Sequence, residues 1–166
     1  MRPAHEVRPA HEVDSWWASA SCADFVAYAG PRLRRAFAAR FGTEVADDLA
    51  AEAIGHAWEN WASVATMANP MGFLFAVGCS KYRRYARWRK RVVFPVEPVR
   101  PIESRKDLFD GLKSLSDDQR VAVLAVHGYG WSYGEVAEIL DVTEAAVTNY
   151  VHRGLKKLRT FLADKS

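Results

Sequence analysis

Residues 132–159 read SYGEVAEILDVTEAAVTNYVHRGLKKLR, and their apolar side chains have the spacing of two short helices joined by a tight turn. Counted from Tyr133, five positions fall where the two helices would face each other: Val136, Leu140, Val142, Val147 and Tyr150. Ala137 falls at the crossing, where a larger side chain would push the helices apart. The pattern predicts a helix-turn-helix, whose second helix normally enters the major groove of DNA.

Capping residues mark the start of both helices. Ser132 and Glu135 have the S-x-x-E spacing of a capping box, and Thr143 precedes the second helix with Glu144 in its first turn. Asp141 stands where the turn usually holds glycine, although Asp tolerates a left-handed backbone better than most residues. A plain helical hairpin in a core is the alternative, but it leaves the coincidence of caps, small residue and apolar spacing unexplained.

Composition limits the classes of protein to which the chain can belong. A chain of 166 residues forms one medium domain or two small ones, and 49% hydrophobic residues suffice for a core. No stretch approaches the ~20 apolar residues that span a bilayer, and MRPAHEVRPAHEV lacks the apolar core of a signal peptide. Cys22 and Cys79 lie far apart, so we expect free thiols in a cytoplasmic protein with no membrane contact.

The formal net charge of +3 is modest, but the basic residues are concentrated. Seven of the eleven residues in 81–91 are basic: Lys81, Arg83, Arg84, Arg87, Arg89, Lys90 and Arg91. This density favours phosphate contact over a generic charged helix end. Tyr82, Tyr85 and Trp88 alternate with the basic residues, and stacking of a base on an aromatic ring contributes ~1–3 kcal/mol. Spacing does not separate rings that stack on bases from rings that pack in the core.

The N-terminal half has the periodicity of helices and few β-branched alternations. One helix is expected from Phe25 to Phe41, kinked or interrupted near its start by Gly30-Pro31. A second is expected over residues 45–61, and a third begins at Pro70. The fold class expected for the whole chain is therefore all-α.

The chain divides into four segments. Residues 1–21 hold a duplicated RPAHEV and are expected to be a disordered tail; His5 and His11 lack the acidic or thiol partners of a metal site. Residues 22–91 form the first helical domain. Prolines at three-residue spacing make 92–107 an extended linker. Residues 108–166 form the second helical domain, in which Ser116 and Gln119 make another capping box.

This arrangement resembles the extracytoplasmic-function sigma factors, compact members of the sigma-70 family that retain regions 2 and 4. The resemblance covers roughly residues 22–162. Its strongest local matches are DDLAAEAIGHAW at 47–58, NPMGFLFAV at 69–77, LSDDQR at 115–120 and WSYGEVAEILDVTEAAVTNYVHRGLKKLR at 131–159. Each match alone is only suggestive, but four in the order of the family make a specific signal.

The resemblance implies a protein that binds core RNA polymerase and directs it to promoters. Asp47, Asp48 and Glu52 match acidic positions of the helix that docks on the β′ clamp helices, and the alternative is a solvated helix face. Region 2 would meet the −10 element and hold an unstacked base. The corresponding residues here are Lys81, Arg83, Arg84, Tyr85, Arg87, Trp88, Arg89 and Arg91.

The sequence also departs from the family in region 2. Members often carry Arg-Asn where Cys79 and Ser80 stand, and Asp where Arg84 stands. These differences indicate either an unusual promoter or a region 2 that contributes mainly non-specific affinity.

In the family, region 4 reads the −35 element with its second helix. The matching positions are Thr148, Asn149, His152, Arg153, Lys156 and Lys157. Asn can bond an adenine edge bidentately, and Arg prefers guanine. Region 4 of the family also contacts the polymerase β-flap, and many members are held inactive by an anti-sigma factor, which adds a candidate partner.

Two other functions remain open at this point. One is a helix-turn-helix regulator that acts on duplex DNA without polymerase, and the other is a sigma-like protein that binds polymerase without opening promoters. An enzyme is the least favoured class. His56 lies at helical spacing from Asp48 and Glu52, but no phosphate loop, nucleophile elbow or Cys/His cluster accompanies them. We therefore expect no catalytic residue, metal or cofactor.

Overall fold

The computed structural model describes residues 15–91 and 106–165, and every regular element in these two ranges is helical. The elements, in chain order, are η1 (Trp16–Ala18), α1 (Cys22–Phe41), α2 (Thr43–Glu59), α3 (Trp61–Val64), α4 (Pro70–Arg91), α5 (Lys106–Lys113), α6 (Asp117–Val123), η3 (Leu124–Gly128), α7 (Tyr133–Leu140) and α8 (Glu144–Ala163). The element η3 is a single π-helical stretch that continues α6. The expected all-α class is confirmed.

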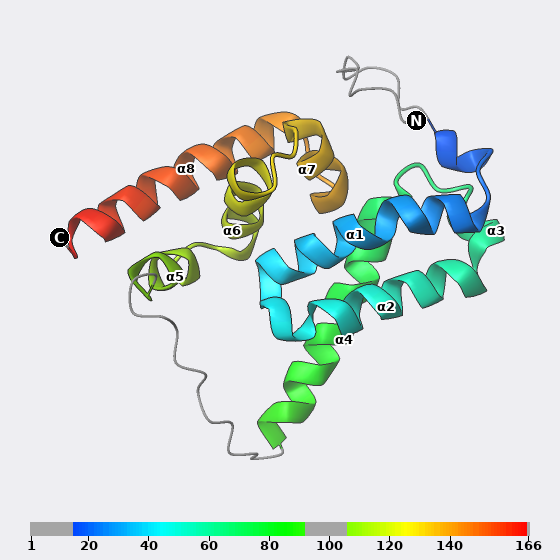
Figure 1. Cartoon of the computed structure of the whole chain (residues 1–166), viewed down its shortest axis with the longest axis horizontal. Coiled ribbons are helices and arrows are strands. Elements are labelled where there is room, and N and C mark those ends of the chain that lie inside the picture. The colour runs from blue at the N-terminus through cyan, green and yellow to red at the C-terminus, as the bar shows by residue number, and fades with distance from the viewer. Residues whose placement is uncertain (1–14, 92–105, 166) are drawn as a thin grey trace.

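The helices form two groups, which Figure 1 shows beside each other. The N-terminal group holds η1 to α4, in which α1 packs along α2 and α4 crosses both. The C-terminal group holds α5 to α8, in which α8 carries α5, α6 and α7. The groups also contact each other, because α6 packs on α1 and α7 packs on α4.

Helix α1 runs without interruption through Pro31, contrary to the expected kink or break. Proline removes one backbone hydrogen bond and costs ~3 kcal/mol in a helix interior. The side chains of Ala29 and Leu33, on either side of the proline, are completely buried, while Pro31 itself faces solvent. Packing of the buried face therefore outweighs the local preference of the proline.

The tail expected over residues 1–21 is partly folded. Trp17 in η1 is buried, and its indole nitrogen donates a hydrogen bond of 3.1 Å to the carbonyl of Met67. An indole buried with its N–H satisfied anchors a chain end firmly. The duplicated RPAHEV and the proline-bearing part of the expected linker lie outside the described residues. Helix α5 begins at Lys106, within the last two residues of that linker.

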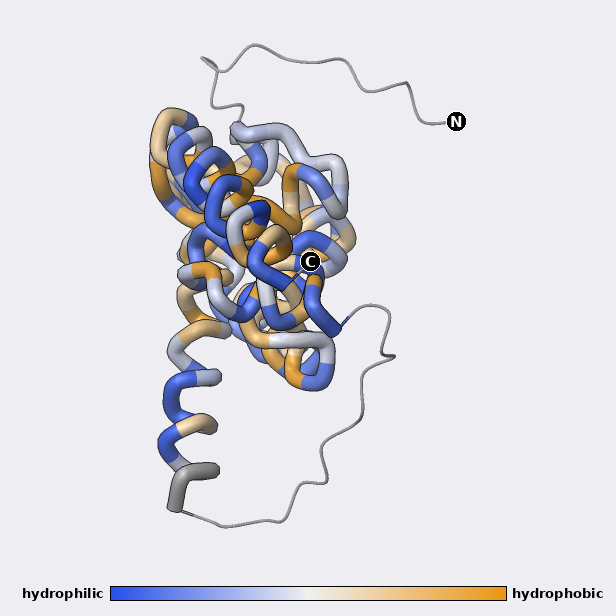
Figure 2. The backbone as a smooth tube through the Cα atoms, turned by 90° about the vertical axis from the view of Figure 1, so that its left-hand side faces the viewer, coloured by the Kyte–Doolittle hydropathy of each residue, from blue (hydrophilic) through white to orange (hydrophobic). Residues whose placement is uncertain are grey.

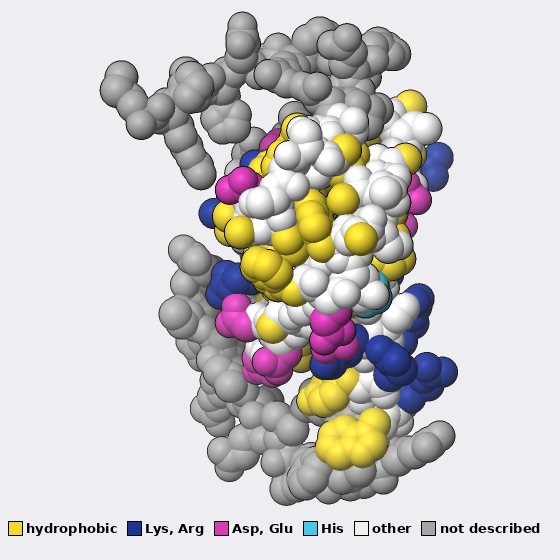
Figure 3. All heavy atoms as spheres, turned by 90° about the vertical axis from the view of Figure 1, so that its right-hand side faces the viewer, with side chains coloured by type: hydrophobic (Ala, Val, Ile, Leu, Met, Phe, Trp, Pro, Cys, Tyr) yellow, Lys and Arg dark blue, Asp and Glu magenta, His cyan; other side chains and the backbone are white. Residues whose placement is uncertain are grey.

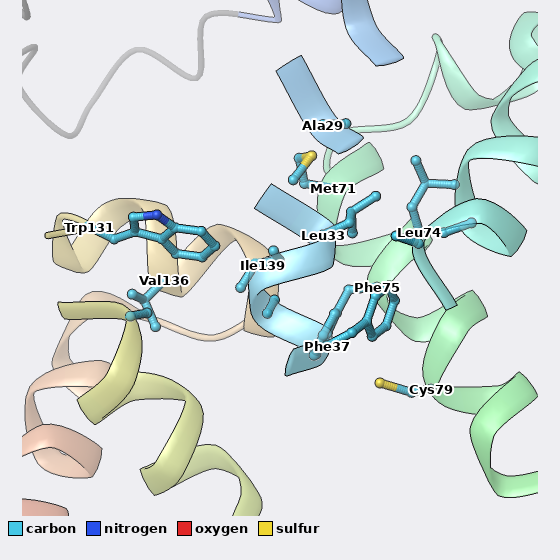
Figure 4. Close-up of a cluster of buried hydrophobic side chains, with 14 of the residues drawn as sticks. Ala29, Leu33, Phe37, Met71, Leu74, Phe75, Cys79, Trp131, Val136 and Ile139 are labelled. Carbon is cyan, nitrogen blue, oxygen red and sulfur yellow. The ribbon is translucent and has the colours of Figure 1, made fainter. Parts of the chain in front are cut away.

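A buried cluster extends across both groups (Figure 4). Phe37 of α1 stacks on Phe75 of α4 with 5.0 Å between ring centroids. Gly78 permits this approach, because a Cβ there would lie 2.1 Å from the Phe37 ring. Trp131 and Ile139 of the C-terminal group belong to the same cluster. The core is therefore continuous rather than divided at the expected linker.

The last turns of α4 project away from the body of the molecule and are mostly hydrophilic (Figure 2). The buried residues of this helix, including Met71, Leu74 and Phe75, lie in its first half. No helix in the described ranges is long and apolar enough to cross a membrane. The described residues of α4 after Cys79 include none that is fully buried.

Candidate nucleic-acid interface

The caps predicted for the helix-turn-helix are all present. The Ser132 hydroxyl accepts from the backbone N–H of Glu135 at 3.1 Å, and the Glu135 carboxylate accepts from the backbone N–H of Ser132 at 2.8 Å. The Thr143 hydroxyl accepts from the N–H of Ala146 at 3.1 Å, which caps α8. Asp141 ends α7 in the left-handed conformation, with φ 54° and ψ 50°. The same sequence signals that predicted the motif therefore fix both helix starts and the turn.

The predicted contact between α7 and α8 is also present. Val136 and Val147 are completely buried, and Ala137 at the crossing is buried. Leu140, Val142 and Tyr150 are partly buried against the same core. The N–H of Val142 donates to the carbonyl of Ala137 at 3.0 Å, which closes the turn. This packing holds α8 rigidly, with one face free for another molecule.

All six residues predicted to read the −35 element lie on the exposed face of α8: Thr148, Asn149, His152, Arg153, Lys156 and Lys157. The Thr148 hydroxyl donates to the carbonyl of Glu144 at 3.0 Å, and the ammonium of Lys157 donates to the carbonyl of Ser114. The structure therefore brings these residues together on one side of one helix. Such a face, with Asn and Arg among the residues, suits the edges and phosphates of a major groove.

The aromatic residues at the end of α4 have different environments. The ring of Tyr82 stacks on Phe41 with 3.9 Å between centroids, so Tyr82 belongs to the core. Tyr85 and Trp88 lie one and two turns further along, with 6.1 Å between their ring centroids. They are 40% and 53% exposed. Their exposure is what base stacking requires, and spacing alone did not reveal it.

Several polar groups near the end of α4 already have protein partners. The ammonium of Lys81 lies 2.7 Å from the carboxylate of Glu52, and the hydrogen bond holds the pKa of Glu52 below its ordinary value. Arg83 donates to the hydroxyl of Ser80 at 3.0 Å. Arg84 and Arg87 are exposed. The side chains of Arg89 and Arg91 lie outside the described residues.

Residues assigned to two different surfaces thus meet on one face. Figure 3 shows acidic side chains next to basic ones, with exposed hydrophobic side chains beneath them. Asp48 and Glu52 line a shallow depression together with Lys81. Asp47 is exposed and pairs with Arg34 of α1. Two of the predicted polymerase-binding residues, Asp48 and Glu52, therefore lie next to Lys81, one of the predicted −10-binding residues.

The positions that depart from the family pattern differ in exposure. Cys79 is buried, and burial raises the pKa of its thiol. Ser80 and Arg84 are exposed. Cys79 thus replaces a larger polar residue in a packed position, whereas the other two differences change the outer surface.

The ring of His56 packs near Phe73, with 5.5 Å between centroids. Within residues 15–91 and 106–165, no three acidic, histidine or cysteine side chains gather as metal ligands would.

Sequence reasoning missed two residues that join the groups. The side chain of Asn69 donates to the carbonyl of Glu138 at 2.8 Å, and that of Arg120 donates to the carbonyl of Arg40 at 2.7 Å. Their only local signals were the position of Asn69 before Pro70 and that of Arg120 in a capping-box helix. Neither signal identifies a partner about 70 or 80 positions away.

The fold and the exposed face of α8 are those of a helical protein with a helix-turn-helix. A family model described as "Sigma-70, region 4" matches residues 106–158. The chain is 26% identical over 133 residues to the ECF RNA polymerase sigma factor SigL of Mycobacterium tuberculosis, covering 72% of this chain and 75% of that protein. It is 35% identical over 60 residues to the RNA polymerase sigma factor CarQ of Myxococcus xanthus, covering 36% of this chain and 34% of CarQ.

Two solved structures have the same fold. The sigma factor RpoE of Bartonella quintana, in complex with the anti-sigma factor NepR, matches with a TM-score of 0.57 at 23% identity, covering 85% of this chain and 96% of RpoE. CnrH in complex with the cytosolic domain of CnrY also matches with a TM-score of 0.57, at 21% identity, covering 93% of this chain and 100% of CnrH. Residues 106–158 thus match sigma-70 region 4, and the chain as a whole is similar to extracytoplasmic-function sigma factors in sequence and in fold.

Proposed function

We propose that the chain binds core RNA polymerase and directs it to promoters whose −35 element is read by α8 and whose −10 element is held at the end of α4. The observation that carries this proposal is the exposed face of α8. Six polar side chains on this face share one side of a capped helix that is packed rigidly on α6 and α7. A helix presented in this way fits the major groove without rearrangement.

The end of α4 carries aromatic rings and cations, the two kinds of group that can bind separated DNA strands. Tyr85 and Trp88 offer exposed rings, and Arg84 and Arg87 offer cations beside them. Unstacking a base step costs a few kcal/mol, which stacking on protein rings and phosphate contacts must offset. The first half of α4 is buried, so the projecting end keeps a fixed position relative to the polymerase-binding face on α2.

The acidic face of α2 is the proposed contact with the β′ clamp helices. Asp48 and Glu52 lie at the rim of one depression, and Asp47 is held by Arg34. Acidic groups at the rim of an interface raise association rates with a basic partner and make the association sensitive to salt. An anti-sigma factor that covered either face would block these contacts, and the similar RpoE was solved in complex with the anti-sigma factor NepR.

The test is a footprint of this chain with core RNA polymerase on genomic promoter fragments, combined with permanganate detection of open strands. We expect protection of two elements and strand opening only when chain and polymerase are both present. Trp88→Ala should reduce opening while leaving −35 protection, and Phe109→Ala is the matched control, because this aromatic residue is 47% exposed on α5, away from the proposed polymerase and DNA contacts. Protection of duplex DNA by the chain alone, unchanged by polymerase, would instead identify a regulator that acts without it.

The burial of Cys79 and the Lys81–Glu52 pair favour a second candidate, a sigma-like protein that binds polymerase without opening promoters. Both features commit residues of region 2 to protein contacts rather than to DNA. In that case core polymerase would be captured by the immobilised chain while run-off transcription stayed silent. Restoring transcription by Arg84→Asp, the residue common in the family, would show that the surface differences cause the silence.

A further inference from the structure

An apolar groove is lined by the turn between α1 and α2, by α5 and by residues at both ends of η3. Its volume is about 510 Å³, within the range of about 300–1,000 Å³ that is usual for clefts that bind ligands. Apolar side chains form most of its walls: Ala39, Phe41, Phe109, Leu112, Leu124 and Tyr129. None of the described residues proposed above to bind polymerase or DNA lines this groove.

Two aromatic side chains of the groove are only partly covered by the other described residues. Phe109 of α5 is 47% exposed, and Tyr129 is 36% exposed. The opposite side of α5 packs tightly on α8, because a Cβ at Gly111 would lie 2.6 Å from the side chain of Leu158. Large apolar side chains that are exposed together in one hollow mark a binding site, whereas singly scattered ones need no explanation.

The charged residues that line the groove are all basic. Arg120 is bonded to two backbone carbonyls of α1, and Arg40 pairs with two carboxylates at the start of α6. Lys113 is exposed, and among residues 15–91 and 106–165 no hydrogen bond or ion pair engages its ammonium. An occupant that carries apolar side chains and a carboxylate therefore complements the groove.

Residues 92–105 connect α4 to α5 and lie outside the described residues, and their sequence has this chemistry. They read VVFPVEPVRPIESR, with Pro95, Pro98 and Pro101 three residues apart. Valine and isoleucine follow these prolines, and Glu97 and Glu103 supply carboxylates. Prolines at this spacing favour the polyproline II helix, and segments of this kind dock in grooves lined by aromatic side chains.

The groove is within reach of both ends of this segment. Phe41 in its wall stacks on Tyr82 of α4 with 3.9 Å between ring centroids. Tyr82 lies ~14 Å along the helix from Arg91, at which α4 ends, so the groove begins within ~25 Å of that end. Helix α5 begins at Lys106, one turn before Phe109. Fourteen residues in polyproline II conformation span ~43 Å, which suffices to enter the groove and return to α5.

We propose that this groove binds the chain's own segment 92–105, with the stretch from Pro98 to Ile102 in polyproline II conformation against the aromatic walls. The segment is tethered at both ends, so its effective concentration at the groove is high and a weak contact suffices. The carboxylate of Glu97 or Glu103 then lies near Lys113. The proposal rests on the groove and on the sequence of the segment, and it is independent of the proposed function.

The test places the photoreactive residue p-benzoylphenylalanine at position 129 of the full chain, in place of Tyr129. Tyr133 is the matched control site, because this tyrosine is 37% exposed at the start of α7 and does not line the groove. After irradiation, mass spectrometry of the digested chain identifies the cross-linked residues. We expect cross-links from position 129 to residues 92–105 of the same chain, and none to that segment from position 133.

Replacement of Pro98 and Pro101 together by glycine tests the conformation of the segment. Glycine enlarges the set of undocked conformations, so the cross-link yield from position 129 should fall by about fivefold. Ser104→Gly is the control, since it leaves all three prolines in place, and circular dichroism checks that helix content is unchanged.

Three results would overturn the proposal. An unchanged yield in the glycine variant would exclude docking in polyproline II conformation. Cross-links that join two chains would assign the groove to a second copy. Cross-links from position 129 that never reach residues 92–105 would exclude the segment as the occupant. None of these results depends on whether the chain binds polymerase or DNA.

Discussion

The two surfaces proposed to bind DNA differ in how many of their polar side chains already bond to other residues of the protein. On α8 the predicted DNA-binding face is exposed to solvent, and Asn149, His152 and Arg153 on it are all exposed. At the end of α4, Lys81 is bonded to Glu52, Arg83 to Ser80, and Tyr82 is stacked on Phe41. A motif defined by local spacing was enough to find the first surface. The second can be assigned only residue by residue, because neighbouring helices compete for its side chains.

The largest expected effect is on the free energy of unfolding, and it comes from disturbing the core packing that holds α4 in place. In Gly78→Ala, the new Cβ would lie 2.1 Å from the Phe37 ring. Overpacking of a core costs ~1–3 kcal/mol, and we expect the upper end because two aromatic rings must move. The measurement is the free energy of unfolding in urea. Gly55→Ala is the control, since nothing lies within 4 Å of its Cβ, and equal stability of the two variants would contradict the packing described for α4.

The next effect tests whether α8 reads bases. Asn149→Ala should relax base preference at about one position of the −35 element, costing ~1–3 kcal/mol of discrimination. Competition binding against single-base variants of the footprinted site measures it. Thr148→Val is the comparison, because that hydroxyl is already bonded to the carbonyl of Glu144. A uniform loss across all sequences would assign Asn149 to the DNA backbone.

A smaller effect separates free from committed cations on α4. Arg87→Ala should flatten the log–log dependence of DNA affinity on salt by ~0.7–0.9, the value for one lost phosphate contact. Lys81→Ala should change the slope less, because its ammonium pairs with Glu52 at 2.7 Å. Binding isotherms measured between about 50 and 200 mM salt provide the comparison. Equal slopes for the two variants would show that Lys81 contacts DNA phosphate as much as Arg87 does, despite its pairing with Glu52.

The smallest effect concerns pH at the interface between the groups. Burial raises the pKa of Glu138 above its ordinary value, outweighing the attraction of Arg32. Such a carboxyl favours folding most below its unfolded pKa of about 4.3, and the benefit is lost as pH rises through the folded value. Glu138→Gln should therefore raise the thermal midpoint slightly at pH 7 and leave it unchanged near pH 4. A midpoint lowered at pH 7 would show that the electrostatic attraction of Arg32 outweighs the cost of burial.

Local signals predicted most of the secondary structure. The boxes at Ser132–Glu135 and Ser116–Gln119 and the cap at Thr143 are contacts between residues three apart, so the sequence displays both partners together. The start of α4 at Pro70 follows from the fixed φ of proline. The helix-turn-helix and its exposed face were therefore within reach of sequence reasoning.

The remaining features depend on partners far along the chain. The burial of Trp17 against Met67 and the continuity of α1 through Pro31 result from tertiary packing that overrides local preference. The contacts of Asn69 and Arg120 join residues about 70 and 80 positions apart, which no helical periodicity relates. The same limit left Tyr82 and Tyr85 indistinguishable, although one stacks inside and the other faces outward.

Helix α4 begins beside Asn69, which bonds to α7, and ends at the exposed rings of Tyr85 and Trp88, and it does so as one unbroken rod. Because the helix is unbroken, a rotation at one end moves the other end. A tilt of about 10° about one end displaces the other by ~6 Å over its ~33 Å length, far more than a hydrogen bond tolerates. Because the first half of the rod is buried, α4 cannot tilt without disturbing the core, and the outer rings therefore keep a fixed place relative to α1 and α2.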